Sequence, residues 1–303
     1  MPELDIVATA PPHALIQQLQ GRLSKGGLSM AHLDARKLQK SAVRACTDAL
    51  VSAGGFKFRR SAFRGQEPKV TLMAPPGLAG LDRSIPVDFS VNCVSPQYNA
   101  ALVQEVLLID GRARDLVLLV RRWAKDRGIC HAARGHLAPY AWTQLAIYFL
   151  QVGVDGGALL PPLQGYKMVN RITVKRGGGE ADAKRGRKTW APPAPGSPAA
   201  CLSVASLFRS FVRFYAEDID WHKEAVSVRR GQRAEANLHL MVHMIKPEGK
   251  APEPGPAIED PFEPARNLGT SVTAPGAQRL REELLRASAL LERGGDLAEL
   301  LAP

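Results

Sequence analysis

Two cationic side chains, Arg121 and Lys125, lie one helical turn apart within the segment Arg114–Ile129. They fall on a face next to an apolar stripe with the i, i+3, i+4, i+7 spacing of an amphipathic helix. Two cations at this spacing can grip the triphosphate tail of a nucleotide. A solvated basic face is the ordinary alternative, and the segment taken alone favours it. The stripe consists of Leu116, Leu119, Val120, Trp123 and Ala124.

Acidic side chains on predicted strands are the second candidates for chemistry. The segment Ile85–Val91 alternates apolar and polar residues, as a half-buried strand does, and this places Asp88 on one face with Ser90. Glu3 and Asp5 are separated by one residue at the start of an apolar strand. Taken by themselves, these three acidic residues fit ordinary charges on a strand face and near a chain terminus.

Histidine and cysteine are weaker candidates for a metal site. His239 and His243 are four residues apart, but the segment "LHLMVHM" alternates like a strand and favours a structural or solvated role. Cys130 and His131, even with His136, lack a fourth ligand. The four cysteines form no CxxC pair, so they suit a reducing compartment and offer neither a disulfide framework nor a zinc cluster.

The predicted elements change character along the chain. Residues 1–95 mix helical spacing with short strand patterns, which predicts an α+β region, and from Asn99 onward the pattern is helical. A Gly-, Lys-, Arg- and Pro-rich segment at about 175–200 predicts a basic disordered insertion. The predicted strands are Glu3–Thr9, Phe56–Phe63, Lys69–Met73 and Ile85–Val91, and the predicted helices are Ala14–Leu23, Leu33–Ala53, Ala100–Leu108, Arg114–Arg127, Pro139–Gln151, Leu202–Tyr215 and Gln278–Arg293.

Length, composition and charge bound the class of protein. The chain has 303 residues, enough for two domains, and 45% of them are apolar, so most of it should fold. It has neither a transmembrane run nor a secretory signal. We therefore expect no membrane partner and an intracellular location, cytoplasmic in preference to nuclear or mitochondrial. The net charge of +11 favours a polyanionic partner, although a basic surface can also serve only solubility.

An ordered set of motifs resembles the noncanonical poly(A) polymerases and terminal uridylyltransferases, within the DNA polymerase beta-like nucleotidyltransferase superfamily. Single motifs of this kind are weak signals, whereas eight in the right order over most of the chain are strong. The motifs are "VDFSVN" (Val87–Asn92), "IDGR" (Ile109–Arg112), "VRRWAKDRGI" (Val120–Ile129), "GHLAPY" (Gly135–Tyr140), "FLQ" (Phe149–Gln151), "LPPLQ" (Leu160–Gln164), "DIDW" (Asp218–Trp221) and "IEDPFE" (Ile258–Glu263).

The resemblance implies an α+β chain of two domains. Residues 1–95 correspond to part of a nucleotidyltransferase catalytic (palm) domain with a mixed sheet. Residues 96–303 correspond to the mainly helical central, PAP-associated domain, which carries the insertion at about 175–200. In this family three acidic residues hold two Mg²⁺ ions, or Mn²⁺ in their place. The resemblance assigns Asp88 as the third carboxylate, placed to activate the RNA 3′-hydroxyl, and Glu3 and Asp5 as the other two.

The resemblance also assigns residues to the nucleotide. Asn99 matches the asparagine that contacts the ribose, although the threonine that usually follows it is alanine here. Arg121 and Lys125 match two phosphate-binding lysines, and Tyr140 matches the aromatic residue that stacks on the base. The residue before Tyr140 is a proline where the family has a phosphate-binding serine, and proline supplies neither a hydroxyl nor an N–H group.

The segment "IEDPFEPARNLG" matches the family's base-reading loop. Asp260 and Glu263 can accept hydrogen bonds from the base or from water. Arg266 occupies the position where the family often has a histidine linked to uridine preference, and Asn267 follows it. Arginine only donates, which suits the uracil carbonyls, whereas asparagine can serve either base. The sequence does not decide between UTP and ATP.

Two functions remain open at this level. The leading one is template-independent addition of U or A to RNA 3′ ends, with an RNA 3′ end and UTP or ATP as partners. The chain begins inside the acidic motif, without the Gly-Ser turn that normally precedes it, so we expect a truncated piece of a longer active enzyme. The alternative is a catalytically inactive relative that binds RNA or nucleotide. A DNA-repair polymerase of the same superfamily fits "IEDPFE" and "LPPLQ" less well.

We predict that this exact 303-residue polypeptide has negligible transferase activity with Mg²⁺, UTP or ATP and an RNA primer. The reason is that the backbone N–H groups and hydroxyl of a Gly-Ser turn, which would hold the β- and γ-phosphates, are absent from it. Primer extension on denaturing gels measures this directly. Robust extension by the unmodified chain would show that the turn is dispensable.

Overall fold

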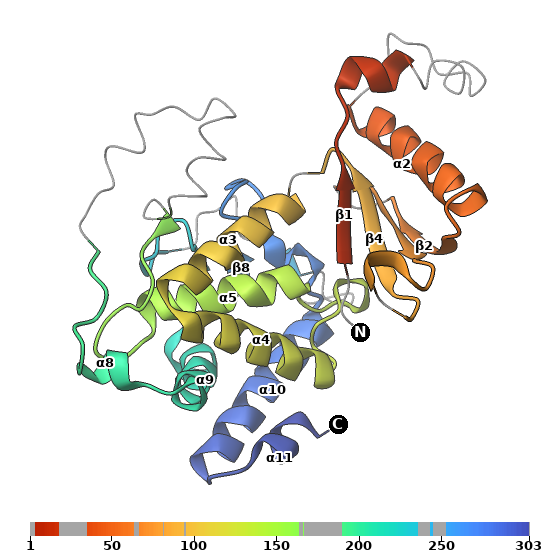
Figure 1. The fold of residues 1–303 in the computed structure, drawn as a ribbon. Coiled ribbons are helices and arrows are strands. Elements are labelled where there is room, and N and C mark those ends of the chain that lie inside the picture. Colours follow the sequence, from red (N-terminus) through yellow and green to blue (C-terminus); the bar gives the residue numbers. More distant parts are fainter. Residues whose placement is uncertain are drawn as a thin grey trace. The chain divides into compact units, whose positions relative to one another are not determined.

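The computed structural model describes residues 4–17, 35–63, 67–80, 82–93, 95–163, 166, 190–235, 243–244 and 253–302. Helices dominate, and the described strands form one mixed sheet and two short ribbons, so the predicted α+β class is confirmed (Figure 1). The chain divides into two compact units, Met1–Gln97 and Tyr98–Pro303. No helix within these ranges is both long and apolar enough to span a bilayer.

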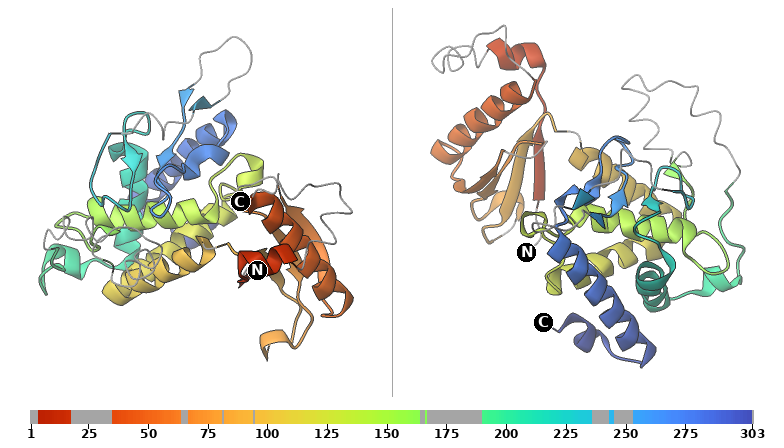
Figure 2. Two further views of the ribbon diagram at one scale, coloured as in Figure 1. Left: turned by 90° about the horizontal axis from the view of Figure 1, so that it is seen from above. Right: turned by 180° about the vertical axis from the view of Figure 1, so that it is seen from behind.

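The first unit is built on a four-stranded sheet with the strand order β1-β4-β3-β2. β1 and β4 are parallel, and the other neighbours are antiparallel. Helix α2 (Ala35–Ser52) covers one face, whereas no described helix of this unit covers the other (Figures 1 and 2). The strands are β1 (Leu4–Ala8), β2 (Lys57–Ala62), β3 (Lys69–Met73) and β4 (Pro86–Val91).

The two faces of this sheet differ in chemistry because side chains alternate along each strand. Val70, Leu72, Phe89 and Val91 pack with the apolar side of α2 in one core cluster. The residues between them point to the opposite face and are mostly polar. In register across the four strands, one row of that face consists of Asp5, Asp88, Thr71 and Arg60.

Asn92, the last residue of the "VDFSVN" motif, fixes the register of β1. Its backbone N–H donates to Ala8 O at 2.8 Å. Its side chain accepts from Ala10 N at 2.9 Å and donates to Ala10 O at 2.8 Å, as another strand residue would. Asn92 adopts a φ of 52°, a left-handed conformation that asparagine tolerates better than most residues. This clamp ties the end of β1 to the end of β4.

The second unit is a helical assembly around α5, whose residues 141–151 are all buried. α4 packs against α5 and α9, and α9 packs against α10 (Figure 2). Trp123 meets Trp142 and Phe208 edge to face at the centre of this core. The helices are α3 (Ser95–Ile109), α4 (Gly111–Asp126), α5 (Pro139–Val152), α8 (Pro198–Cys201), α9 (Val204–Arg213), α10 (Ala274–Glu292) and α11 (Leu297–Leu301).

The "IDGR" motif has a structural explanation. Asp110 caps α4 by accepting from Arg112 N at 2.9 Å. The Arg112 guanidinium is held by that same carboxylate, and its Nη1 donates to the carbonyls of Ala199, Ala200 and Leu202 at 2.9–3.1 Å. These carbonyls lie in and just after α8. The motif therefore anchors the segment around α8 to the start of α4.

A buried ion pair joins α10 to the end of α4. Glu283 accepts from Arg127 Nε at 2.7 Å and Nη2 at 2.9 Å, and both side chains are almost fully buried. Arg279 Nη2 also contacts the carboxylate at 2.6 Å. Burial would raise the pKa of Glu283, but the hydrogen bonds and charges of the surrounding arginines lower it below its ordinary value. The carboxylate is thus held ionised inside the helical unit.

Most predicted elements match the structure within a few residues, with two differences. The predicted helix Leu202–Tyr215 is α9, which is capped by Ser203 and followed by a π-helical turn, Phe214–Asp218. Residues 190–200 of the predicted disordered insertion contain the start of α8 and a Trp190 Nε1–Ala158 O hydrogen bond, so disorder does not extend over them. The remainder of the insertion, and His239, lie outside the described residues, whereas His243 lies in the ribbon β6 (His243–Met244) paired with β7 (Glu253–Pro254).

We expect Asn92→Ala and Asn92→Gly to loosen β1 by removing both side-chain bonds to Ala10, at a cost of about 2 kcal/mol. Alanine should cost about 1 kcal/mol more than glycine because of the left-handed φ. Hydrogen exchange of the β1 amides measures the effect, with the α5 amides as internal reference. Unchanged β1 protection in both variants would contradict the clamp.

Candidate functional site

The polar face of the sheet brings together two of the three predicted catalytic carboxylates. Asp5 and Asp88 are partners in the parallel register of β1 and β4, so their side chains project from the same face. Asp88 is almost fully buried, and Asp5 is exposed. Glu3 lies outside the described residues. The resemblance places these two acids in one site, and the pairing of β1 with β4 shows how residues 83 positions apart come together there.

Asp88 is bound by two side chains of β3. Lys69 Nζ lies 2.5 Å from Oδ2, and Thr71 Oγ1 donates to Oδ1 at 2.6 Å. Thr71 Oγ1 in turn accepts from Arg60 Nε at 3.1 Å. Burial would raise the pKa of Asp88, but the bonds from Lys69 and Thr71 and the charges of Lys69 and Arg60 lower it. Asp88 is therefore a carboxylate at neutral pH.

The donor chemistry of this face fits a hard divalent cation. Carboxylate oxygens are the ligands that Mg²⁺ and Mn²⁺ prefer, and Asp5 and Asp88 present them side by side on neighbouring strands. No group of three or more His, Cys, Asp or Glu placed to hold a metal occurs within the described residues. The third acid of the predicted set, Glu3, is outside those residues.

The predicted phosphate-binding cations lie on the exposed side of α4. Arg121 and Lys125 are exposed, and neither side chain forms a hydrogen bond or ion pair with another described residue. Their neighbour Arg122 differs, because it pairs with Asp126 at 2.5 Å. Leaving two cations one turn apart without a counter-charge costs self-repulsion, which an anionic ligand would relieve.

The predicted sugar and base contacts lie at the starts of two helices. Asn99 is in the first turns of α3, and its Oδ1 is buried without a hydrogen-bond partner among the described residues. Tyr140 is the second residue of α5 and is half-buried. Pro139 is the first helical residue, where its fixed φ and missing N–H are tolerated. The N-cap residue, Ala138, makes no side-chain cap hydrogen bond.

The recognition loop, residues 259–267, is closed at its base by Asn267. A β-bridge pairs Glu259 with Asn267, directly after β8 (Ala257–Ile258), which is parallel to β5 (Ala225–Val226). Asn267 Oδ1 accepts from Ile258 N at 3.0 Å and Gly269 N at 2.7 Å, while Nδ2 donates to Pro256 O at 3.2 Å. The amide predicted to read the base is thus engaged with the backbone of its own loop.

Asp260 and Arg266 face one another across the loop. Asp260 is almost fully buried, and its Oδ1 accepts from Phe262 N at 3.0 Å. Its Oδ2 lies 3.4 Å from Arg266 Nη1, and Glu263 Oε2 lies 3.9 Å from the same nitrogen. Burial raises the pKa of Asp260. Asp260 is placed to shape the turn and orient Arg266, whereas Glu263 is the exposed acid of the pair.

Two supports of this loop were missed at the sequence level. Glu259 is buried and pairs with Arg229 Nε at 2.5 Å. Phe262 stacks on Tyr98 of α3, with ring centroids 4.8 Å apart and planes 21° apart. Tyr98 immediately precedes Asn99, so the stack joins the loop to the start of α3. The aromatic and acidic residues of "IEDPF" were visible in the sequence, but their partners are distant in the chain.

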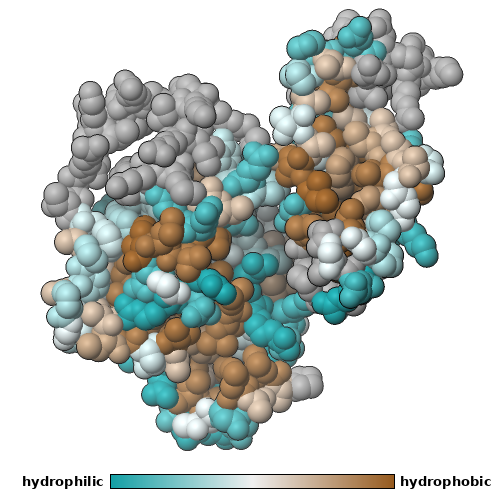
Figure 3. Space-filling view, in the orientation of Figure 1, coloured by the Kyte–Doolittle hydropathy of each residue, from teal (hydrophilic) through white to brown (hydrophobic). Residues whose placement is uncertain are grey.

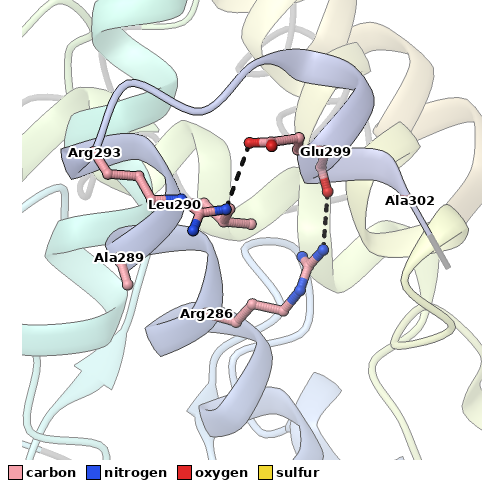
Figure 4. Close-up of a pocket in the computed structure, with 6 residues that line it drawn as sticks. All are labelled: Arg286, Ala289, Leu290, Arg293, Glu299 and Ala302. Atoms are coloured by element: carbon pink, nitrogen blue, oxygen red, sulfur yellow. Dashed lines mark hydrogen bonds and ion pairs between the residues drawn. The ribbon is translucent and has the colours of Figure 1, made fainter.

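Two further surface features are present. Hydrophobic residues gather over α3, where Leu108 is 71% exposed (Figure 3). A shallow pocket of about 500 Å³ lies where α10 meets α11 (Figure 4). There Arg286 Nη2 donates to Glu299 O at 2.9 Å and Arg293 Nη2 lies 3.6 Å from Glu299 Oε2, so both arginines hold α11 in place. Its lining is Arg286, Ala289, Leu290, Arg293, Glu299 and Ala302.

Comparisons with known proteins agree with these features. The family model described as Cid1 family poly A polymerase matches residues 203–266. The terminal uridylyltransferase cid1 of Schizosaccharomyces pombe is 28% identical over 227 residues, which cover 70% of this chain and 52% of the relative. The poly(A) RNA polymerase GLD2-A of Xenopus laevis is 25% identical over 222 residues, covering 71% and 39%. The chain therefore spans about half or less of the length of these relatives.

Solved structures show the same fold. A structure of Cid1, described for its RNA terminal uridylyl transferase activity, has a TM-score of 0.63 at 22% identity and covers 89% of this chain and 78% of its own. The GLD-2/RNP-8 complex gives a TM-score of 0.61 at 21% identity, with coverages of 90% and 77%.

The chain shares the fold of these Cid1 and GLD-2 structures, with a mixed-sheet unit followed by a mainly helical unit. Within that fold class, the chain is similar to noncanonical poly(A) polymerases and terminal uridylyltransferases, and the family model matches residues 203–266. These relatives are of the enzyme class that the motifs predict.

We expect Asn267→Ala to lower the free energy of unfolding by about 2–4 kcal/mol, because three backbone groups of the loop lose their partner. Glu263→Ala, a neighbouring exposed position, should change it by less than about 0.5 kcal/mol. Urea unfolding followed by tryptophan fluorescence compares the two. Equal stability of the two variants would show that Asn267 does not hold the loop.

Proposed function

We propose that this chain is the nucleotide-transferring part of a template-independent enzyme that adds U or A to RNA 3′ ends. The observation that carries the proposal is the in-register pairing of Asp5 and Asp88 on the polar face of the sheet. The relatives named above are a terminal uridylyltransferase and a poly(A) RNA polymerase, which supports the same reaction here.

In this proposal Asp88, Asp5 and Glu3 hold Mg²⁺ or Mn²⁺. When bound, the metal lowers the charge cost of an in-line displacement at the α-phosphate of the nucleotide. Asp88 contributes a carboxylate that its surroundings keep ionised at neutral pH, as oxygen coordination requires. It is also the residue proposed to draw the proton from the RNA 3′-hydroxyl.

The helical unit supplies the grip on the nucleotide. Arg121 and Lys125, both exposed and one turn apart on α4, offer positive charge for the triphosphate. Tyr140 offers an aromatic face for the base, and Asn99 Oδ1 offers an unused acceptor for a ribose hydroxyl. These contacts position the nucleotide without forming bonds to the reacting phosphorus.

The recognition loop offers hydrogen-bond donors to the base. Arg266 can only donate, and the Asn267 amide is already engaged by the backbone. Uracil presents two carbonyl acceptors, whereas the exocyclic amine of adenine is itself a donor. We therefore propose that, of the two nucleotides this enzyme could add, the loop favours UTP over ATP.

A catalytically inactive, nucleotide-binding or RNA-binding protein is the second candidate. Two observations favour it. Both oxygens of Asp88 are occupied by Lys69 and Thr71. Pro139 also lacks the hydroxyl and N–H that the family serine would direct at a phosphate. A protein of this kind would bind UTP but leave the RNA primer unextended.

We expect the natural form of the protein to extend an RNA primer with UTP faster than with ATP. Asp88→Asn should reduce the rate by about 10²-fold or more, because it removes the carboxylate that accepts the proton of the 3′-hydroxyl. Arg121→Ala and Lys125→Ala should each raise KM for UTP about tenfold through lost charge-assisted contacts.

Arg122→Ala is the matched control, because Arg122 is exposed on the same helix but already paired with Asp126. It should leave KM unchanged. Activity that survives Asp88→Asn would refute the catalytic assignment. UTP binding without any extension by the natural form would favour the inactive candidate.

A further inference from the structure

The two oxygens of Asp88 are held by very different side chains. Oδ1 accepts from Thr71, whose hydroxyl is fixed in turn by Arg60. Oδ2 is paired with Lys69, whose side chain is 44% exposed although Asp88 itself is only 4% exposed. Oδ1 is therefore bound by the hydroxyl of a short side chain that has a second hydrogen-bond partner. Oδ2 is bound by the ammonium at the end of a long, partly exposed side chain.

We propose that Lys69 is a resident counter-ion of the catalytic centre, which neutralises Asp88 when no divalent cation is bound and is displaced when one binds. This inference rests on the proposed metal-binding role of Asp88. It assigns Lys69 a positioning role, because the lysine acts through Asp88. It also reconciles the occupied oxygens of Asp88 with a site that must accept a cation.

Electrostatics gives the reason for such a residue. Asp5 and Asp88 face each other in register, and two carboxylates on neighbouring strands repel. A cation at Oδ2 relieves that repulsion before metal arrives. Lysine suits the task, since its ammonium is strongly hydrated and sits on a flexible stem that can return to water. Thr71 can stay in place throughout, so the carboxylate keeps its orientation.

The exchange predicts competition between the ammonium and the divalent ion. Removing the ammonium leaves the site more negative by one charge and deletes the competitor. Lys69→Met should therefore bind divalent cations about tenfold more tightly, as expected for a unit charge at short range in a partly solvated site. Lys69→Arg keeps a cation on β3 and should stay close to the wild-type affinity.

The first test is Mn²⁺ binding to the full chain, measured by electron paramagnetic resonance of the free ion. The variants are Lys69→Met, Lys69→Arg and Asp88→Asn, with Lys57→Met as the matched control for loss of an exposed lysine elsewhere on the sheet. Thermal melts in chelator confirm that each variant folds. The expected result is tighter binding by Lys69→Met, weaker binding by Asp88→Asn and no change in Lys57→Met.

The outcomes separate the two proposals. If Asp88→Asn binds Mn²⁺ as the wild type does, the metal role of Asp88 in the proposed function is overturned, and the Lys69 inference falls with it. If Asp88→Asn weakens binding but Lys69→Met does not tighten it, only the inference about Lys69 is overturned.

A second readout uses the unmodified protein. Amine acetylation of Lys69, followed by mass spectrometry, should quicken when Mn²⁺ is added, because displacement frees the ammonium from its carboxylate. Lys57 in the same sample serves as the reference and should not respond. In Asp88→Asn, the reactivity of Lys69 should no longer respond to Mn²⁺. A Lys69 reactivity that ignores Mn²⁺ in the wild type would overturn the proposal, even if Lys69→Met fails to fold.

Discussion

The parallel pairing of β1 with β4 is the constraint on which the candidate catalytic centre depends. It joins two segments more than eighty residues apart, and Asn92 secures it by presenting its amide to both backbone groups of Ala10. A slip of one residue would turn Asp5 to the face that packs on α2. Asn92, with its left-handed φ at the end of β4, therefore helps to decide that Asp5 is the β1 residue beside Asp88.

The same face shows how a cation site can remain stable before it is filled. Its carboxylates are not left to repel one another in water, because β3 supplies one hydroxyl and one ammonium to Asp88. The Thr71 side chain is short and its hydroxyl is also bonded by Arg60, so it fixes the orientation of the Asp88 carboxylate. The Lys69 side chain is long and partly exposed, so its ammonium can move away from Asp88. Thr71 and Lys69 are two positions apart on the same face of β3, so both reach Asp88. Thr71 keeps the carboxylate oriented, and Lys69 can be exchanged for a metal ion.

The sequence predicted the elements well and the long-range partners poorly. The strand Lys69–Met73 was predicted with its observed bounds, and α4 and α5 within a few residues, because periodicity is a local signal. Family resemblance placed Asp88 and Asp5 in one site, yet gave no hint that Lys69 and Thr71 hold Asp88. The bonds of Asn267 to Pro256, Ile258 and Gly269 were equally hidden, since a short motif does not record which atoms its polar groups bind.

The carboxylates of the recognition loop also have partners that the motif does not record. Of the three carboxylates in "IEDPFE", Glu259 is buried against Arg229 and Asp260 is buried beside Arg266 and the turn it caps. Only Glu263 is exposed, at 54% of its side chain. Two buried carboxylates therefore maintain the loop, and a donor, Arg266, is presented from it. In the sequence, the acidic residues of this motif look like a set of hydrogen-bond acceptors. In the structure, two of them hold the loop that carries the Arg266 guanidinium. Buried charged groups can serve this positioning role when each has a partner.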